Sequence, residues 1–167
     1  MWPVQERRSG VVMTGGRSSL PGGLYRILEL PEINVAVFGF MLNFIWEFLQ
    51  APFFQSLPRM PHWEAVKLCT LATIGDAAIM LGAFWCVAAA TRTRSWISRS
   101  GWRRLAGFSG MGIAITIVLE LVSVSAGRWE YSDSMPVVPY AGIGLLPLAQ
   151  WIVLPPLTAW FVRRQLT

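Results

Sequence analysis

The chain is poor in charge, in cysteine and in histidine. Charged residues make up 14% of its 167 positions, against about 25% in an average soluble domain. Its two cysteines, Cys69 and Cys86, lie in one apolar run, too far apart along a helix to form a disulfide. We expect both to be packing thiols, with neither a disulfide framework nor a metal cluster in the protein.

Several common functional motifs are also missing. The sequence has no P-loop, no dinucleotide-binding glycine motif and no nucleophile elbow, so we expect no cofactor. The net charge of +5 resembles that of nucleic-acid-binding proteins. However, the basic residues flank apolar runs and do not form one stripe, so they predict membrane orientation and no nucleic-acid partner.

Apolar residues dominate instead, at 54% of the chain, and they gather in four long runs. The expected spans are residues 33–51, 68–90, 105–126 and 140–162. Each is close to the roughly 20 residues that cross a bilayer as a helix. Lipid offers no partners for backbone N–H and C=O groups, so such spans must be helical. The sequence therefore predicts an all-α membrane protein, a bundle of four transmembrane helices at residues 31–167.

Lysine and arginine positions predict the orientation of this bundle. Eleven lie before the first span, between the second and third, or after the fourth, and only three lie in the other two loops. By the positive-inside rule both termini are cytoplasmic, in a multi-pass protein of a bacterial inner membrane. Trp96 and Trp102 are expected to anchor the middle loop at the interface. Residues 1–30 are expected to be a flexible basic arm, starting at Met1 or Met13.

Three expected spans carry a carboxyl group: Glu47, Asp76 and Glu120. A charged group inside a bilayer costs roughly 2.5–3.5 kcal/mol on insertion scales. Counted along the spans, all three fall in the outer half of the membrane or near its middle, as does Gln150. This clustering favours one polar cavity open to the outside, where a carboxylic acid that keeps its proton could act as an acid.

Helical spacing supports inward-facing polar stripes. Asn43 and Glu47 stand four residues apart on the first span, and Thr116 and Glu120 repeat that spacing on the third. The alternative is that these groups are only hydrogen-bonding contacts between helices. Two further expectations follow from residue type. Gly75 and Gly82 should permit close approach of helices, and the prolines of the fourth span should bend or break it, with Gln150 turned toward Asp76.

The loops over the expected cavity add other candidates. His62, the only histidine, is a candidate for catalysis or for a structural hydrogen bond. Arg128 and Glu130 are candidates for closing the cavity by pairing with the first loop, or are simply solvated. Aromatic faces stabilise cationic or polyene groups. The tryptophans expected to line a ligand site, or simply to pack, are Trp46, Trp63, Trp129 and Trp151.

The last quarter of the chain contains Gly127-Arg-Trp129-Glu-Tyr131, a loop with prolines, and then Gly142-Ile143-Gly-Leu-Leu-Pro147-Leu-Ala-Gln150-Trp151. This order resembles the end of the membrane lycopene-cyclase domain, in which Gly-x-Trp-x-Tyr and Gly-Ile precede a Pro-Leu-Glu-Glu-type segment. The resemblance implies action on long isoprenoid polyenes by proton-initiated cyclisation, with carboxylates inside the membrane. Ala149 and Gln150 replace that family's paired glutamates, so the acids of this chain must come from elsewhere.

Three hypotheses follow. In the first, the chain binds or transforms a hydrophobic, isoprenoid-like ligand. Its candidate catalytic residues are Glu47, Asp76, Glu120 and His62, and its candidate ligand-binding residues are Asn43, Trp46, Trp129, Gln150 and Trp151. In the second it is an accessory subunit whose polar stripes meet partner membrane subunits or another copy of itself. In the third it is a small proton-coupled transporter.

Overall fold

A computed structural model describes residues 27–99 and 101–167, so most of the expected N-terminal arm lies outside the described part. Four helices dominate it: α2 (Pro31–Gln50), α3 (His62–Thr91), α4 (Trp102–Ser125) and α5 (Leu145–Leu166). All four are long and apolar enough to cross a membrane. The all-helical prediction is thereby confirmed, and the described residues contain isolated β-bridges but no strand.

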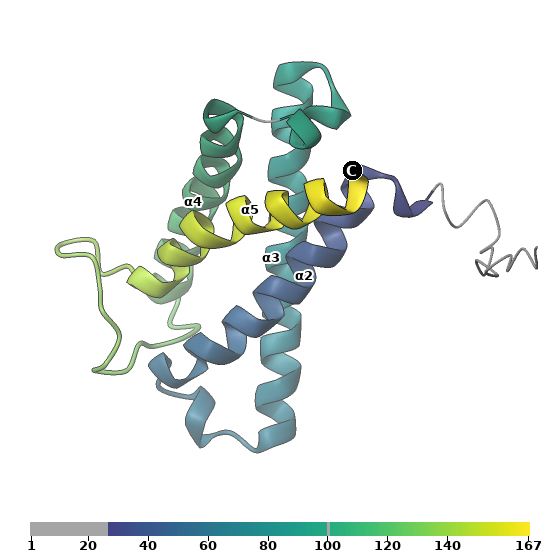
Figure 1. Cartoon of the computed structure of the whole chain (residues 1–167). Coiled ribbons are helices and arrows are strands. Elements are labelled where there is room, and N and C mark those ends of the chain that lie inside the picture. Colours follow the sequence, from purple (N-terminus) through teal and green to yellow (C-terminus); the bar gives the residue numbers. More distant parts are fainter. Residues whose placement is uncertain (1–26, 100) are drawn as a thin grey trace, which may run out of the picture.

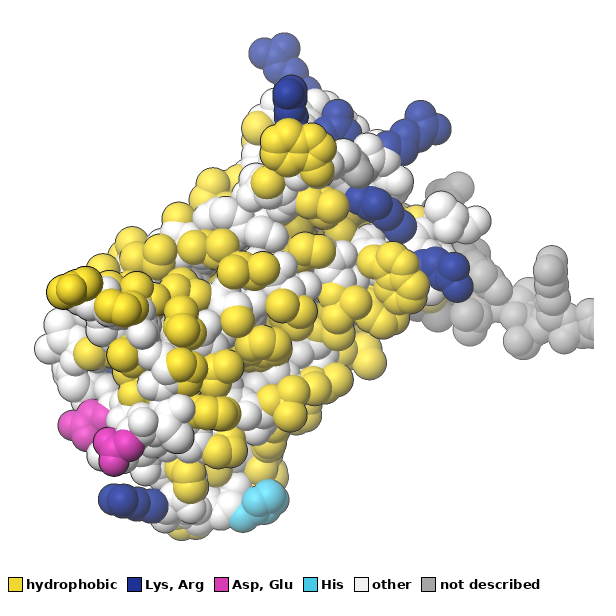
Figure 2. Space-filling model, turned by 60° about the vertical axis from the view of Figure 1, so that its left-hand side comes forward, with side chains coloured by type: hydrophobic (Ala, Val, Ile, Leu, Met, Phe, Trp, Pro, Cys, Tyr) yellow, Lys and Arg dark blue, Asp and Glu magenta, His cyan; other side chains and the backbone are white. Residues whose placement is uncertain are grey.

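The helices run alternately up and down, and the C-terminus lies near the start of α2 (Figure 1). The short helix η3 (Arg94–Arg99) joins α3 to α4 at this same end. Basic side chains gather there, and apolar side chains cover the flanks (Figure 2). We call this end the arginine-rich end, after Arg92, Arg94, Arg99, Arg103, Arg104, Arg163 and Arg164. The other end, the loop end, holds η1 (Ala51–Phe53), η2 (Leu57–Arg59) and residues 126–144.

Two helices begin elsewhere than their apolar runs predicted. Helix α3 starts at His62 rather than at 68, because Pro61 precedes it as N-cap and the polar residues that follow continue the helix. Helix α5 starts at Leu145 rather than at 140. Tyr140 and Gly142 have φ values of 66° and 64°, in the left-handed region that a right-handed helix cannot accommodate.

The expected break in the fourth span is not present. Helix α5 continues from Leu145 to Leu166 through Pro155 and Pro156. Each proline removes a single backbone donor, so two adjacent prolines interrupt the ladder at two neighbouring bonds only. Pro155 is also fully buried, so packing against the neighbouring helices supports this segment.

The apolar core lies toward the arginine-rich end. Phe84 of α3, Trp96 of η3 and Phe108 of α4 form its aromatic centre, and all three are completely buried. The ring centroids of Trp96 lie 5.6 Å from those of Phe84 and 5.4 Å from those of Phe108. The indole N–H of Trp96 donates to the carbonyl of Phe84 at 3.2 Å. The prediction that Trp96 is an interfacial anchor was therefore wrong, whereas Trp102 is 74% exposed.

The buried face of each helix changes character along its length. Toward the arginine-rich end α2 buries Val35 and α5 buries Leu154, Ala159 and Val162. Toward the loop end many of the buried side chains are polar. They include Asn43, Glu47 and Gln50 of α2, Thr116, Glu120 and Ser123 of α4, and Gln150 of α5. One half of the bundle is thus an ordinary apolar core, and the other half is built around polar groups.

Candidate functional site

A cavity of about 580 Å³ occupies the polar half of the bundle. Three helices supply its acidic groups: Glu47 from α2, Asp76 from α3 and Glu120 from α4. Gln150 of α5 lines it as well. Residue counts along the spans predict a similar depth for these four side chains, and the structure brings all four into one cavity. The expectation of one shared cavity agrees with this geometry.

Gln150 connects three helices by hydrogen bonds. Its side-chain N–H group donates to Asn43 Oδ1 at 2.6 Å and to Asp76 Oδ2 at 2.7 Å. Asn43 is fixed in turn, because its own amide donates to the carbonyl of Gly39 at 2.7 Å. Asn43 is completely buried and does not line the cavity, so it contributes to the site by accepting the hydrogen bond from Gln150. This chain of contacts holds the Asp76 carboxyl in a defined position.

Glu47 is held by its own helix and faces Asp76. Gln50 donates to Glu47 Oε1 at 2.7 Å, and Trp46 donates to Gln50 Oε1 at 3.1 Å. Glu47 and Asp76 both line the cavity, from two helices that pack against each other. Two carboxyl groups can share a hydrogen bond only when one of them carries a proton. Two acids in one cavity are therefore suited to hold a proton between α2 and α3.

Glu120 has a different environment. Its Oε2 atom accepts hydrogen bonds from the hydroxyl of Tyr131 and from the indole N–H of Trp129, the latter at 3.4 Å. Burial raises the pKa of Tyr131 to about 12, and the bond to Glu120 adds to the rise. The phenol therefore stays protonated and donates throughout the neutral range. Two donors that meet on one oxygen suit a carboxylate anion.

The two loops of the loop end pair directly over the cavity. Phe54 and Tyr131 form an antiparallel β-bridge, with Gln55 N–H donating to the carbonyl of Glu130 and Ser132 N–H to that of Phe53, both at 2.9 Å. Phe54 lines the cavity. The loops are thus joined by backbone hydrogen bonds, not by the expected side-chain pairing of Arg128 and Glu130. Arg128 lines the cavity beside Trp129.

The lining of the cavity includes residues that are also exposed on the apolar surface of the helices. These are Leu68 and Leu71 of α3 and Leu119 of α4, which are 47%, 66% and 46% exposed. Trp151 lines the cavity as well and is 1% exposed. Exposed apolar side chains and buried carboxyl groups therefore belong to the same cavity.

Other predicted site residues lie outside this arrangement. His62 is exposed at the first position of α3 and does not line the cavity. Trp63 is 65% exposed. Trp46 packs against the apolar core and reaches the site only through Gln50. The described residues contain no group of three or more His, Cys, Asp or Glu side chains placed to hold a metal ion.

Sequence reasoning missed two features of the site. Tyr131, the main partner of Glu120, was part of the motif quoted above, but its distance from Glu120 along the chain concealed the contact. The glycines at close helix contacts are Gly39, against Met80 Sδ, and Gly112, against Trp151. The predicted ones, Gly75 and Gly82, would meet nothing within 4 Å if they carried a Cβ. No local pattern distinguishes these two classes of glycine.

Comparisons with protein-family models, with curated proteins and with solved structures found no match. The resemblance to the lycopene-cyclase domain therefore stays a prediction. What the geometry offers chemically is two acids in one cavity, a third carboxyl group with two donors, and apolar side chains that line the same space.

Proposed function

We propose that this chain is an integral membrane protein that binds a hydrophobic, isoprenoid-like ligand in the carboxyl cavity and acts on it by acid chemistry. One observation carries the proposal: the cavity that contains Glu47, Asp76 and Glu120 is also lined by Leu68, Leu71 and Leu119, which are exposed on α3 and α4 and suit a side entrance for an apolar molecule. A water-soluble substrate would not need an apolar side entrance, whereas a lipid-dissolved ligand would.

The two acidic environments suggest separate roles. The Glu47–Asp76 pair is the proton source, because two acids that line one cavity can share a proton between them. Glu120 is the counter-charge, because two donors hold its oxygen as an acceptor. A protonated polyene carries positive charge, which the carboxylate and the faces of Trp129 and Trp151 would stabilise.

The topology belongs to the same proposal. The arginine-rich end faces the cytoplasm, both termini are cytoplasmic, and the carboxyl cavity lies toward the outer side of a bacterial inner membrane. The unequal distribution of basic residues between the two ends supports this orientation.

The ligand is tested by extracting the purified protein with organic solvent and identifying apolar compounds by mass spectrometry. We expect an isoprenoid to be enriched relative to an unrelated membrane protein purified in parallel. Leu71→Trp, which fills the lateral entrance, should lower the enrichment at least tenfold. Leu121→Trp is the matched control, because Leu121 is 48% exposed on α4 but does not line the cavity.

The acid chemistry is tested with amide variants. Glu47→Gln, Asp76→Asn and Glu120→Gln keep the size of each side chain and remove its proton or charge. We expect each variant to remain folded and to retain the extracted compound in an altered ratio of substrate to product. Unchanged ratios in all three would contradict acid chemistry. An empty cavity together with a stoichiometric partner subunit would favour the accessory role instead.

A further inference from the structure

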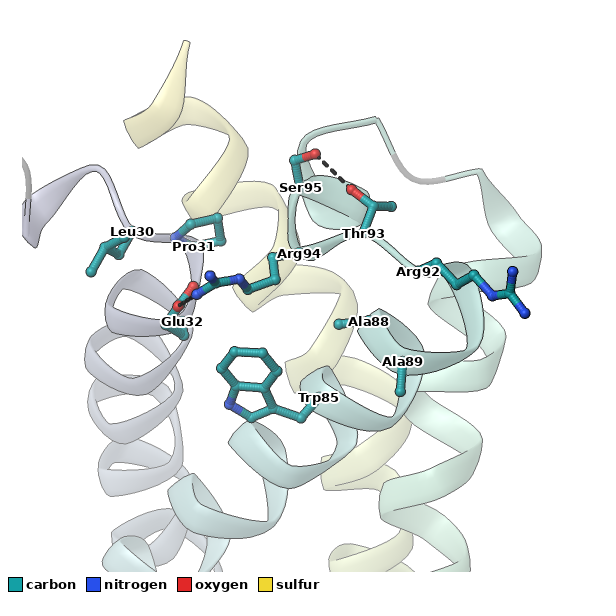
Figure 3. A pocket seen from close by; sticks show the side chains of 10 residues that line it. All are labelled: Leu30, Pro31, Glu32, Trp85, Ala88, Ala89, Arg92, Thr93, Arg94 and Ser95. Atoms are coloured by element: carbon teal, nitrogen blue, oxygen red, sulfur yellow. Dashed lines mark hydrogen bonds and ion pairs between the residues drawn. The ribbon is translucent and has the colours of Figure 1, made fainter.

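A second pocket, of about 640 Å³, lies at the arginine-rich end. It is formed by the start of α2, the end of α3 and the beginning of η3 (Figure 3). It shares no lining residue with the carboxyl cavity, so its role rests on the proposed membrane topology but not on the proposed ligand or acid chemistry. Its walls combine the indole of Trp85 with two arginines and two hydroxyl groups.

Arg94 is held in place within this pocket. Its Nη1 lies 2.9 Å from Glu32 Oε1, and its guanidinium carbon lies 5.7 Å from the centroid of the Trp85 ring. A guanidinium has five N–H donors, and this contact with Glu32 uses one of its nitrogens. The Arg94 side chain is 64% exposed, whereas that of Glu32 is 14% exposed. The Glu32 carboxylate thus holds one edge of the guanidinium, and the indole lies against its face. The other edge is available.

Hydroxyl groups lie at the rim of the pocket. The oxygens of Thr93 and Ser95 lie 3.0 Å apart, so one hydroxyl donates to the other and one hydrogen remains for another acceptor (Figure 3). The Arg92 side chain starts at the rim on the far side from Glu32 and points outward (Figure 3). With two arginines and one glutamate the lining carries an excess of positive charge. This charge and the free edge of Arg94 are suited to a phosphate group.

The floor of the pocket is apolar. Ala88 and Ala89 of α3 line it, and Leu30 lies at its edge with 39% of its side chain exposed. Trp85 is 42% exposed, at the end of a helix that is long enough to span a membrane. A free phosphate ion would gain nothing from these surfaces, whereas the glycerol and upper acyl carbons of a lipid would cover them.

From this combination we propose that the pocket binds the phosphate of an anionic phospholipid. The available edge of Arg94 contacts the phosphate oxygens, and Arg92 adds positive charge at the rim. The acyl chains leave along the apolar surface beside Trp85. Basic pockets between helices at the cytoplasmic side of membrane proteins are suited to such headgroups.

The test is native mass spectrometry of the whole protein with phosphatidylglycerol and phosphatidylcholine of identical acyl chains. We expect phosphatidylglycerol to bind about tenfold more tightly, as for one or two arginines near a lipid surface. Arg94→Gln should abolish this preference. Arg103→Gln is the matched control, because Arg103 also lies over an indole at the same end, 5.6 Å from that of Trp102, but outside the pocket.

Glu32→Gln separates a built site from general attraction. This variant makes the arginine-rich end more positive, so unspecific attraction would bind phosphatidylglycerol more tightly. The proposed site would bind it more weakly, because Arg94 loses the partner that positions it. Tighter binding in this variant, equal loss in Arg103→Gln, or full competition by glycerol 3-phosphate would overturn the proposal. Circular dichroism of each variant establishes that the helices are intact.

Discussion

The indole of Trp151 occupies the space that a side chain at Gly112 would need. A Cβ built on Gly112 would lie 1.8 Å from Trp151 Cε3 and 2.4 Å from Trp151 Cδ2. Trp151 is also a wall of the carboxyl cavity and is almost completely buried. Glycine at this position on α4 therefore decides where the ring on α5 lies and how wide the cavity is beside it.

Gly112→Ala should destabilise the bundle by about 1–3 kcal/mol, because the ring or the two helices must move apart. The same change should alter the occupancy of the carboxyl cavity. Thermal unfolding in detergent measures the first effect and ligand extraction the second. Gly82→Ala is the control: a Cβ there meets nothing within 4 Å and the position does not line the cavity, so this variant should be at least as stable as the wild type. Equal stability of Gly112→Ala would show that Trp151 moves at no cost.

Gln150→Leu should destabilise the protein by about 1–2 kcal/mol, since it leaves Asn43 Oδ1 and Asp76 Oδ2 without their donor. The change keeps most of the side-chain volume, so lost packing contributes little. Gln55→Leu provides the comparison, because Gln55 is exposed and only its backbone N–H is used. Similar unfolding temperatures for both variants would mean that the contacts of Gln150 contribute no net stability.

Tyr131 should release its proton later than an ordinary tyrosine, which titrates near pH 10. Its folded-state pKa is raised to about 12, so its contribution to stability is fully present below pH 10 and disappears as pH rises through 12. Tyrosinate absorbance during an alkaline titration measures this release. In Tyr131→Phe the late component should be missing. A wild-type titration completed by pH 11 would contradict the predicted environment of this phenol.

The proposed topology predicts which engineered cysteines an impermeant thiol reagent reaches in intact cells. With Cys69 and Cys86 replaced by alanine, Arg59→Cys and Ser132→Cys should be labelled, because both positions belong to the loop end. Ser98→Cys, in η3 at the arginine-rich end, should be labelled only after the cells are opened. The opposite pattern would reverse the orientation and place the carboxyl cavity on the cytoplasmic side.

Much of the bundle was predictable because lipid imposes strict conditions on sequence. Apolar runs of sufficient length had to be helices, and the polar groups inside them had to face other helices. For that reason the expectation that Gln150 turns toward Asp76 agrees with the structure. Outside the spans, hydropathy places fewer constraints on the backbone. The start of α5 depended on left-handed conformations at Tyr140 and Gly142, which hydropathy does not reveal.

Long-range partners could not be predicted from the sequence either. Trp96 stands among arginines, a typical interfacial context, yet η3 folds it inward between Phe84 and Phe108. The role of Gly112 depends on a large ring that approaches from another helix. His62 was expected in a loop that covers the carboxyl groups. In the structure α3 begins at His62, and this side chain is exposed.

Tyr131 belongs to two arrangements at once, since it donates to Glu120 and pairs with Phe54 across the loops. A ligand that took over the Glu120 carboxylate would compete with the phenol that helps to hold the loops together. Occupancy of the cavity and order of the loop end are therefore thermodynamically linked. The backbone N–H groups of Gln55 and Ser132, which join the two loops, should exchange with solvent at rates that report whether the cavity is filled.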